Sequence, residues 1–205
     1  MDSEIVCGLF DAMSKKSSIT LESVNRRSER VTENRVVPLR IMSSTQNGRQ
    51  YLMAYVPRFR RIASFRTDYI LSVRIDEECG CFDELRTKLD EMRKYMWGVS
   101  TQSRSGDRLE HVEFTVKYAD DEQHIHRRLE REKRCGKVER IDNNTSRFSA
   151  DVYDASEMIP WIRTFICRIT DIRFSDPGTE AQFKDDISAL YKLYGMGEED
   201  VNDIQ

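Results

Sequence analysis

The feature that most constrains the fold is a change of hydrophobic spacing near residue 78. Before it, an amphipathic helix over 3–16 is followed by five short segments with the spacing and β-branched content of strands, at 18–25, 36–42, 49–56, 61–66 and 69–75. Pro38 predicts an edge position or a bend in its strand, and Asn47-Gly48 predicts a turn. One helix and five short strands predict a small, open β-barrel.

The second half follows a different order. A helix over 82–97 and a polar stretch over 99–108 precede a strand at 110–118, a charged helix at 120–134, strands at 137–141 and 147–153, a short helix at 156–165 and a strand at 167–174. This βαββαβ order is the ferredoxin-like pattern. After a turn at 176–178, a last helix is expected to begin at a capping box of Thr179 and Gln182.

The sequence therefore predicts an α+β protein with two domains. Residues 1–78 form the helix and barrel, 79–107 a linker helix and loop, 108–195 the βαββαβ domain with its final helix, and 196–205 an acidic tail. A final helix with a broad apolar face is wide enough to be shared with a second copy. We therefore expect a homodimer to which the C-terminal half contributes.

The charge is unevenly distributed, although the net charge is only −3. Residues 23–75 hold eleven arginines, no lysine and three acidic residues, whereas 176–205 hold eight acidic residues and two lysines. Arginine binds phosphate with two parallel hydrogen bonds and stacks on bases. The first half is therefore predicted to bind an anion, and a solvated barrel surface that is merely basic is the alternative.

Cysteine use and hydropathy indicate a cytoplasmic protein. Five cysteines are an odd number and too few for a disulfide framework in a chain of 205 residues. No apolar run approaches the roughly 20 residues that cross a bilayer, and the start MDSEIVCGLF lacks the basic residues of a signal peptide. We expect no contact with a membrane.

Catalytic and metal-binding patterns are weak. His124 and His126 are two residues apart on a predicted helix and point in different directions. Cys79-Gly80-Cys81 lacks the second pair of a zinc ribbon and the two-residue gap of the common redox motif. There is no phosphate loop, dinucleotide fingerprint or nucleophile elbow. We therefore expect no catalytic residue, no metal, no cofactor and no enzymatic activity.

The strongest candidate site lies between residues 49 and 70, where arginines alternate with aromatic residues. On the strands of a small barrel, guanidinium groups can bind phosphates while aromatic faces stack bases. The predicted ligand-binding residues are Tyr51, Arg58, Arg60, Arg61 and Arg66, with Asp68 orienting Arg66. The alternative is a barrel core of aromatic residues with arginines pointing outward.

These segments resemble the WYL domain of bacterial transcriptional regulators. The resemblance rests on Val37-Pro38-Leu39, Tyr51-Leu52 and Phe65-Arg66-Thr67-Asp68-Tyr69-Ile70. The second half is similar to the C-terminal extension that follows many WYL domains, including its Trp-Ile pair at 161–162. Three positions depart from the family pattern: Gln50 replaces the tryptophan, Tyr69 an arginine and Ser23 an aromatic residue.

The resemblance implies an Sm-like or SH3-like barrel that senses a nucleotide or single-stranded nucleic acid in a transcriptional regulator. In the family this barrel follows a helix-turn-helix. Here helix 3–16 leads directly into a strand, so we expect DNA contact only through a helix-turn-helix not present in this chain. A stand-alone protein that binds single-stranded RNA or DNA is the second hypothesis, and a nucleic-acid-processing enzyme is the third.

Overall fold

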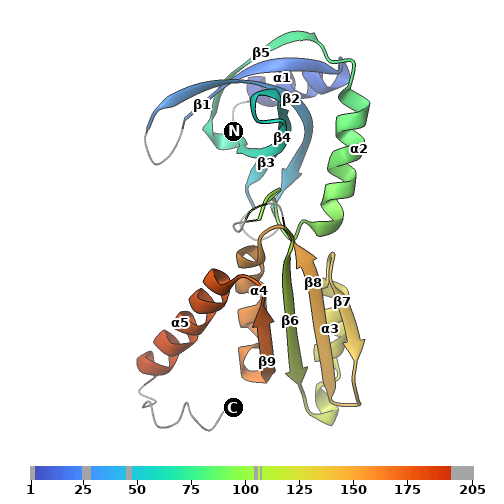
Figure 1. Ribbon diagram of the computed structural model, residues 1–205, viewed down its shortest axis with the longest axis vertical. Coiled ribbons are helices and arrows are strands. Elements are labelled where there is room, and N and C mark those ends of the chain that lie inside the picture. The colour runs from blue at the N-terminus through green and yellow to red at the C-terminus, as the bar shows by residue number, and fades with distance from the viewer. Residues whose placement is uncertain (1–2, 25–28, 45–47, 104–105, 107, 195–205) are drawn as a thin grey trace. The chain divides into compact units, whose positions relative to one another are not determined.

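The computed structural model describes residues 3–24, 29–44, 48–103, 106 and 108–194. These residues form two compact units that divide between Thr101 and Gln102. Each unit has its own antiparallel sheet, and five α-helices accompany the two sheets (Figure 1). The predicted acidic tail and the Asn47 half of the predicted turn lie outside the described residues.

The first unit begins with α1 (Ser3–Ser14) and continues with β1 (Ser17–Val24), β2 (Val31–Ser43), β3 (Gln50–Val56), β4 (Arg61–Arg66) and β5 (Ile70–Glu78). A 3₁₀ turn, η1 (Pro57–Phe59), joins β3 to β4, and another, η2 (Thr67–Tyr69), joins β4 to β5. The strand order is β4-β3-β2-β1-β5. Because β4 and β5 are the two edges, the sheet is not closed into a barrel within the described residues.

The long strand β2 bends in the middle of this sheet. Its first half pairs with β1 up to Val36, its second half pairs with β3 from Val37 onward, and the register shifts between Pro38 and Arg40. The bend predicted at Pro38 is confirmed, but the edge position is wrong because β2 lies between two paired strands. The strand also begins at Val31, earlier than predicted, since backbone pairing with β1 continues through the polar residues 31–35.

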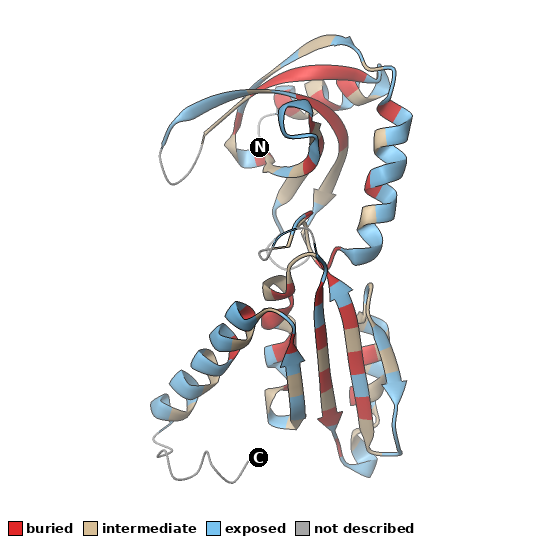
Figure 2. Cartoon of the chain, in the orientation of Figure 1, coloured by how far each residue is buried: buried red, intermediate tan, exposed pale blue. Residues whose placement is uncertain are grey.

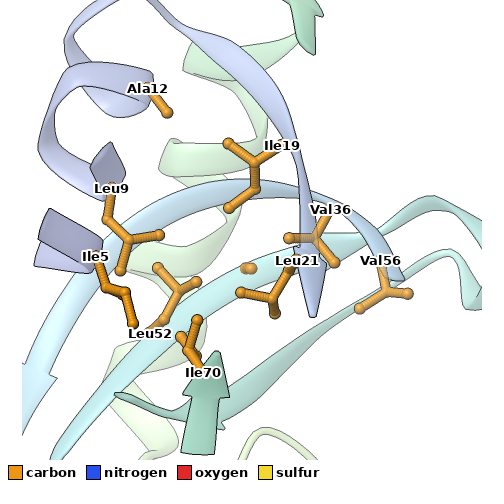
Figure 3. Close-up of a cluster of buried hydrophobic side chains, with 10 residues drawn as sticks. Ile5, Leu9, Ala12, Ile19, Leu21, Val36, Leu52, Val56 and Ile70 are labelled. Atoms are coloured by element: carbon orange, nitrogen blue, oxygen red, sulfur yellow. The ribbon is translucent and has the colours of Figure 1, made fainter. Parts of the chain in front are cut away.

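The bend encloses an apolar core between α1 and the inner face of the sheet. Side chains of α1 meet residues from β1, β2, β3 and β5 (Figure 3). The members of this core are Ile5, Leu9, Ala12, Ile19, Leu21, Val36, Leu52, Ala54, Val56 and Ile70. Alternate residues of β3 supply three of them, so the other residues of that strand are directed away from this core.

Helix α2 (Phe82–Met92) ends earlier than predicted and continues as a 3₁₀ turn over Arg93–Tyr95. It packs on the first unit through Phe82 and Leu89, which are buried. The polar stretch that follows is anchored to the same unit, because the Thr101 hydroxyl donates to the carbonyl of Ile62 at 2.9 Å.

The second unit contains β6 (Glu110–Lys117), α3 (His124–Glu132), β7 (Lys137–Arg140), β8 (Thr145–Val152), α4 (Ile159–Ile162), β9 (Ile169–Phe174) and α5 (Pro177–Leu193). The element order through β9 agrees with the sequence prediction, and the strand order is β7-β8-β6-β9. Burial alternates along β6 and β8 (Figure 2). The buried rings include Phe114 and Phe148, which stack with centroids 5.1 Å apart, and Trp161 meets Phe148 edge-on at 5.0 Å.

The start of α5 corrects the predicted capping box. Asp176 is the N-cap, and its carboxylate accepts from the Thr179 backbone N–H and hydroxyl, each at 2.8 Å. Pro177 occupies the first turn, where a missing N–H costs nothing. The predicted turn at 176–178 is therefore part of the helix, whose described residues bury only Thr179 and Phe183.

Candidate ligand-binding site

Arg66 ends β4 and is held in place by the next turn of the chain. Its Nε donates to Asp68 Oδ1 at 3.0 Å, and Nη2 donates to Asp68 Oδ2. Its guanidinium lies 4.0 Å from the centroid of the Tyr69 ring, and the side chain is 19% exposed. The turn itself is fixed by buried Thr67, whose hydroxyl donates to the Gln50 carbonyl at 3.1 Å. Arg66 is therefore pre-oriented.

The electrostatics of this pair follow from its hydrogen bonds. The hydrogen bond from Arg66 lowers the pKa of the Asp68 carboxyl, although partial burial opposes the shift. The same hydrogen bond raises the pKa of Arg66. Both groups are charged at neutral pH. Asp68 accepts from Nε and Nη2, so the pair with Asp68 does not use the Nη1 hydrogens of the guanidinium.

An open pocket of about 240 Å³ lies beside Arg66. It is lined by residues from the ends of β1, β2 and β4 and from η2: Ser23, Val24, Thr32, Asn34, Ser64, Phe65, Arg66 and Tyr69. Hydroxyl and amide groups, one cation and two aromatic rings thus meet at a single opening. We call this the Arg66 pocket. Its chemistry suits an anion attached to a flat, polar group.

Tyr51 lies next to Arg66 as its direct partner in the β3–β4 pairing, and it is half-buried. Directly opposed residues of neighbouring strands share one face of a sheet. Tyr51 and Arg66 are therefore brought together, and of the two only Arg66 lines the pocket.

Arg58, Arg60 and Arg61 surround the turn at the opposite end of β4. Phe59 is 54% exposed, and the guanidinium carbons of Arg58 and Arg61 lie 5.5 Å and 5.3 Å from its ring centroid. Arg60 has φ 52°, in the left-handed region, and its backbone N–H donates to the Pro57 carbonyl at 3.1 Å. We call residues 57–61 the Phe59 turn. Its exposed ring and cations form a surface on which a base can stack.

The structure thus divides the predicted site into two clusters. Arg61 and Arg66 are the first and last of the six residues of β4, and the five residue steps between them correspond to about 17 Å at roughly 3.3–3.4 Å per residue. A spacing of five also directs the two side chains to opposite faces of the strand. A single phosphate cannot contact both clusters.

Sequence reasoning missed several residues that the fold brings to Arg66. Ser23 and Tyr69 entered only as departures from a family pattern, and Thr32 and Asn34 lay between the strands predicted at 18–25 and 36–42. Tyr69 directly follows Arg66 and Asp68 in the sequence, and this position was the one signal that could have assigned it to the site. Phe59 was placed among the alternating aromatics, but its exposure follows only from the 3₁₀ turn.

The described residues contain no group of three or more histidine, cysteine, aspartate or glutamate side chains arranged to hold a metal ion. Within the same ranges, no helix is long and apolar enough to cross a membrane.

Comparison with known proteins identifies the first unit. Residues 4–75, which include α1, the sheet through Ile75, the Arg66 pocket and the Phe59 turn, match the model of the WYL domain. This segment of the chain is a WYL domain. The match includes both clusters of the predicted site and the three departures from the family pattern. A search of curated protein sequences finds no match.

Two solved structures are similar over most of the chain. A CRISPR Cas-related protein matches 94% of this chain and 52% of its own, with 13% identity and a TM-score of 0.60, which supports a common fold. Proteasome accessory factor B/C of Arthrobacter aurescens matches 95% of this chain and 28% of its own, with 14% identity and a TM-score of 0.41. The chain therefore spans about half of the first protein and less than a third of the second.

Proposed function

We propose that this chain is the ligand-sensing module of a bacterial transcriptional regulator and that it binds single-stranded nucleic acid or a nucleotide through its WYL domain. The observation that carries the proposal is the pre-oriented Arg66, held by Asp68 over Tyr69 at the edge of a polar pocket. Fixing a cation before the ligand arrives reduces the ordering cost of binding. In this proposal the protein is cytoplasmic, recognises its ligand and catalyses no reaction.

The two clusters assign different parts of a ligand to different residues. A nucleotide fits the Arg66 pocket, with its phosphate on Arg66 and its base against Tyr69, while Tyr51 contacts it from beside Arg66, outside the pocket lining. A longer single strand also reaches the Phe59 turn, where Arg58, Arg60 and Arg61 bind phosphates and the Phe59 ring stacks a base. Because β4 is an edge strand, the polymer can pass around it without disrupting the sheet.

The same proposal extends to the architecture. The bent β2, shared between β1 and β3, supports an open Sm-like barrel over the WYL domain. The antiparallel order β7-β8-β6-β9, with α3 and α4 in the two crossovers, supports a ferredoxin-like extension domain over 108–194.

Direct binding tests the ligand assignment. A fluorescein-labelled oligothymidylate is titrated with the full chain at low salt, with thymidine monophosphate and a duplex oligonucleotide as competitors. We expect the oligothymidylate to bind, the mononucleotide to compete weakly because it occupies one cluster, and the duplex to compete least. Failure of both single strand and mononucleotide to bind would refute the proposal.

A stand-alone nucleic-acid-binding protein and a nucleic-acid-processing enzyme can each be distinguished from the proposed regulator by one observation. A helix-turn-helix encoded in frame upstream of Met1 favours the regulator, and a stand-alone nucleic-acid-binding protein has none. An enzyme would release cleaved product from the oligothymidylate in the presence of Mg²⁺ or Mn²⁺. We expect the oligothymidylate to remain intact.

We also propose that the second unit forms a homodimer through α5. Phe183 packs inside its own unit, with its ring centroid 5.7 Å from that of Phe174, so it is not available to a partner. The rest of the apolar face is open, with Leu193 79% and Tyr194 74% exposed. Beside it lies an apolar groove of about 480 Å³ lined by Ile166, Cys167, Ile187, Leu190, Tyr191 and Tyr194. A twofold pair would place the exposed side chains of one copy in the groove of the other.

Sedimentation equilibrium tests the dimer. We expect a dimer at tens of micromolar for the wild type and a monomer for the Leu190→Glu/Leu193→Glu variant, because two carboxylates would be buried in the interface. Leu71→Glu is the matched control, since Leu71 is 52% exposed in the first unit. A monomeric wild type would contradict the proposal.

A further inference from the structure

Two cysteines meet in the loop between β5 and α2. Cys79 Sγ and Cys81 Sγ are 3.4 Å apart, within hydrogen-bonding distance for sulfur. Cys81 is exposed and Cys79 is half-buried. The loop is anchored at one end by the Cys79 backbone N–H, which donates to the Lys16 carbonyl at 2.8 Å. At the other end Cys81 is the N-cap of α2, and its carbonyl accepts from the Leu85 N–H at 3.0 Å. The fold thus holds two thiols in contact at the surface.

The contact between the two sulfurs places them within reach of a disulfide. An S–S bond is about 2.05 Å long, so the two sulfurs need to approach by about 1.4 Å, which side-chain rotation and a small backbone adjustment supply. Gly80, between them, has open space on the side where a β-carbon would lie. The intervening peptide can therefore adjust without a steric clash.

We propose that Cys79 and Cys81 form a reversible intramolecular disulfide when the protein encounters hydrogen peroxide, which makes this loop an oxidant-modified site. The proposal is independent of the ligand-binding function, because the two thiols lie outside the Arg66 pocket and the Phe59 turn.

The reaction divides between the two sulfurs according to their exposure. The Cys81 thiolate attacks one peroxide oxygen, the O–O bond breaks, and the departing hydroxide takes up the proton released by Cys81 to form water. Cys81 is then a sulfenic acid. The Cys79 sulfur attacks the Cys81 sulfur, the S–O bond breaks, and the hydroxide leaves with the Cys79 proton as a second water. The two thiols are oxidised by two electrons and one peroxide is reduced to two waters.

Burial supports this order. Partial burial and, to a smaller extent, the hydrogen bond with Cys81 raise the pKa of the Cys79 thiol above its usual value. Cys79 therefore keeps its proton and reacts slowly with peroxide itself, whereas it is in contact with Cys81 and can resolve the sulfenic acid.

Peptide mapping of the full chain tests the proposal. The protein is treated with hydrogen peroxide, the remaining thiols are alkylated with iodoacetamide, and the chain is digested with trypsin. Cleavage after Arg74 and Arg86 yields one peptide, 75–86, which contains both Cys79 and Cys81 and no other cysteine. We expect this peptide to lose two hydrogens and to escape alkylation, and dithiothreitol to restore both thiols. Cys7, Cys135 and Cys167 remain alkylated.

Single variants separate a disulfide from simple surface oxidation. In Cys81→Ser, Cys79 is expected to stay alkylatable after the same peroxide dose. In Cys79→Ser, Cys81 is expected to accumulate sulfenic acid, which dimedone traps. Cys7→Ser is the matched control, because Cys7 is an exposed thiol on another element, and it should leave the disulfide intact. A wild-type 75–86 peptide that stays fully alkylated, or one that is linked to another chain instead, would overturn the proposal.

Discussion

Arginines lie at both ends of β4, but the arginine at one end is held in place and those at the other end are exposed. At one end Arg66 is mostly buried, hydrogen-bonded twice to Asp68 and stacked on Tyr69. At the other end Arg58 and Arg61 are exposed and rest on an exposed phenylalanine ring. A fixed cation recognises the geometry of one group, whereas exposed cations attract any polyanion in a salt-dependent manner. Recognition is therefore expected at the Arg66 pocket, and the Phe59 turn is expected to add length-dependent affinity.

The largest effect is predicted for Arg66→Ala. Loss of the fixed guanidinium should weaken both oligothymidylate and thymidine monophosphate by roughly tenfold or more, because charge-assisted hydrogen bonds are the strong class. Fluorescence anisotropy and competition measure the two ligands. Arg74→Ala is the matched control, since Arg74 lies on β5 of the same unit with its side chain 73% exposed. A lower melting temperature with unchanged affinity would instead mean that Arg66 and Asp68 form a structural ion pair only.

A smaller and more selective effect is predicted for Phe59→Ala. Base–aromatic stacking is worth about 1–3 kcal/mol per base, and the low end of that range corresponds to about fivefold. We therefore expect about fivefold weaker binding of the oligothymidylate and no change for the mononucleotide, which does not reach this turn. Circular dichroism should show an unchanged fold, because Phe59 is not part of the core. Equal losses for both ligands would show that the two clusters are not separate.

The sequence identified the arginines and Tyr51 of the site, but it did not predict that the site divides into two clusters. Alternation along 49–66 identified the strands, and β4 has the predicted bounds, Arg61–Arg66. Sequence proximity suggested one cluster, but a strand of six residues extends the chain and directs its two terminal arginines to opposite faces. The pocket wall combines residues from β1, β2 and η2, whose meeting depends on the bend in β2. A local pattern contains no information on that bend beyond Pro38.

Ion pairs in the folded chain also reduce the basic character of residues 23–75. Three arginines of the basic window pair with acidic residues that follow it in the sequence: Arg35 with Glu77, Arg40 with Asp90 at 3.0 Å, and Arg74 with Asp76 at 3.6 Å. The surface is therefore less basic than the window of 23–75 indicates. Which arginines can attract a ligand depends on long-range pairing, which composition does not reveal.

Salt dependence gives a smaller effect that distinguishes the two ends of β4. Each phosphate neutralised on a single strand contributes roughly −0.7 to the slope of log K against log salt. The Arg58→Ala/Arg61→Ala variant should therefore reduce the magnitude of the oligothymidylate slope by about 1.4, and Arg66→Ala by about 0.7. Anisotropy titrations over a range of NaCl concentrations measure both. An unchanged slope in the double variant would remove the Phe59 turn from the interface.

The smallest effect is predicted for the pH dependence of stability, and it concerns the Arg66–Asp68 pair alone. The hydrogen bond from Arg66 lowers the pKa of Asp68 in the folded protein relative to the unfolded chain, where it is about 3.9. A lowered folded pKa contributes stability that is fully present above the unfolded pKa and is lost as the pH falls through the folded pKa. Asp68 is about half exposed, so solvent screens the pair.

At neutral pH we expect Asp68→Asn to lower the melting temperature by about 1–3 °C. As the pH falls below about 4 that difference should begin to shrink, because the unfolded chain then takes up the proton, and it should vanish only below the lowered folded pKa, where the wild-type carboxylate is protonated as well. Differential scanning fluorimetry of both proteins across this range measures it, and a difference that persists unchanged in acid would show that the carboxylate charge of Asp68 does not hold Arg66 in place.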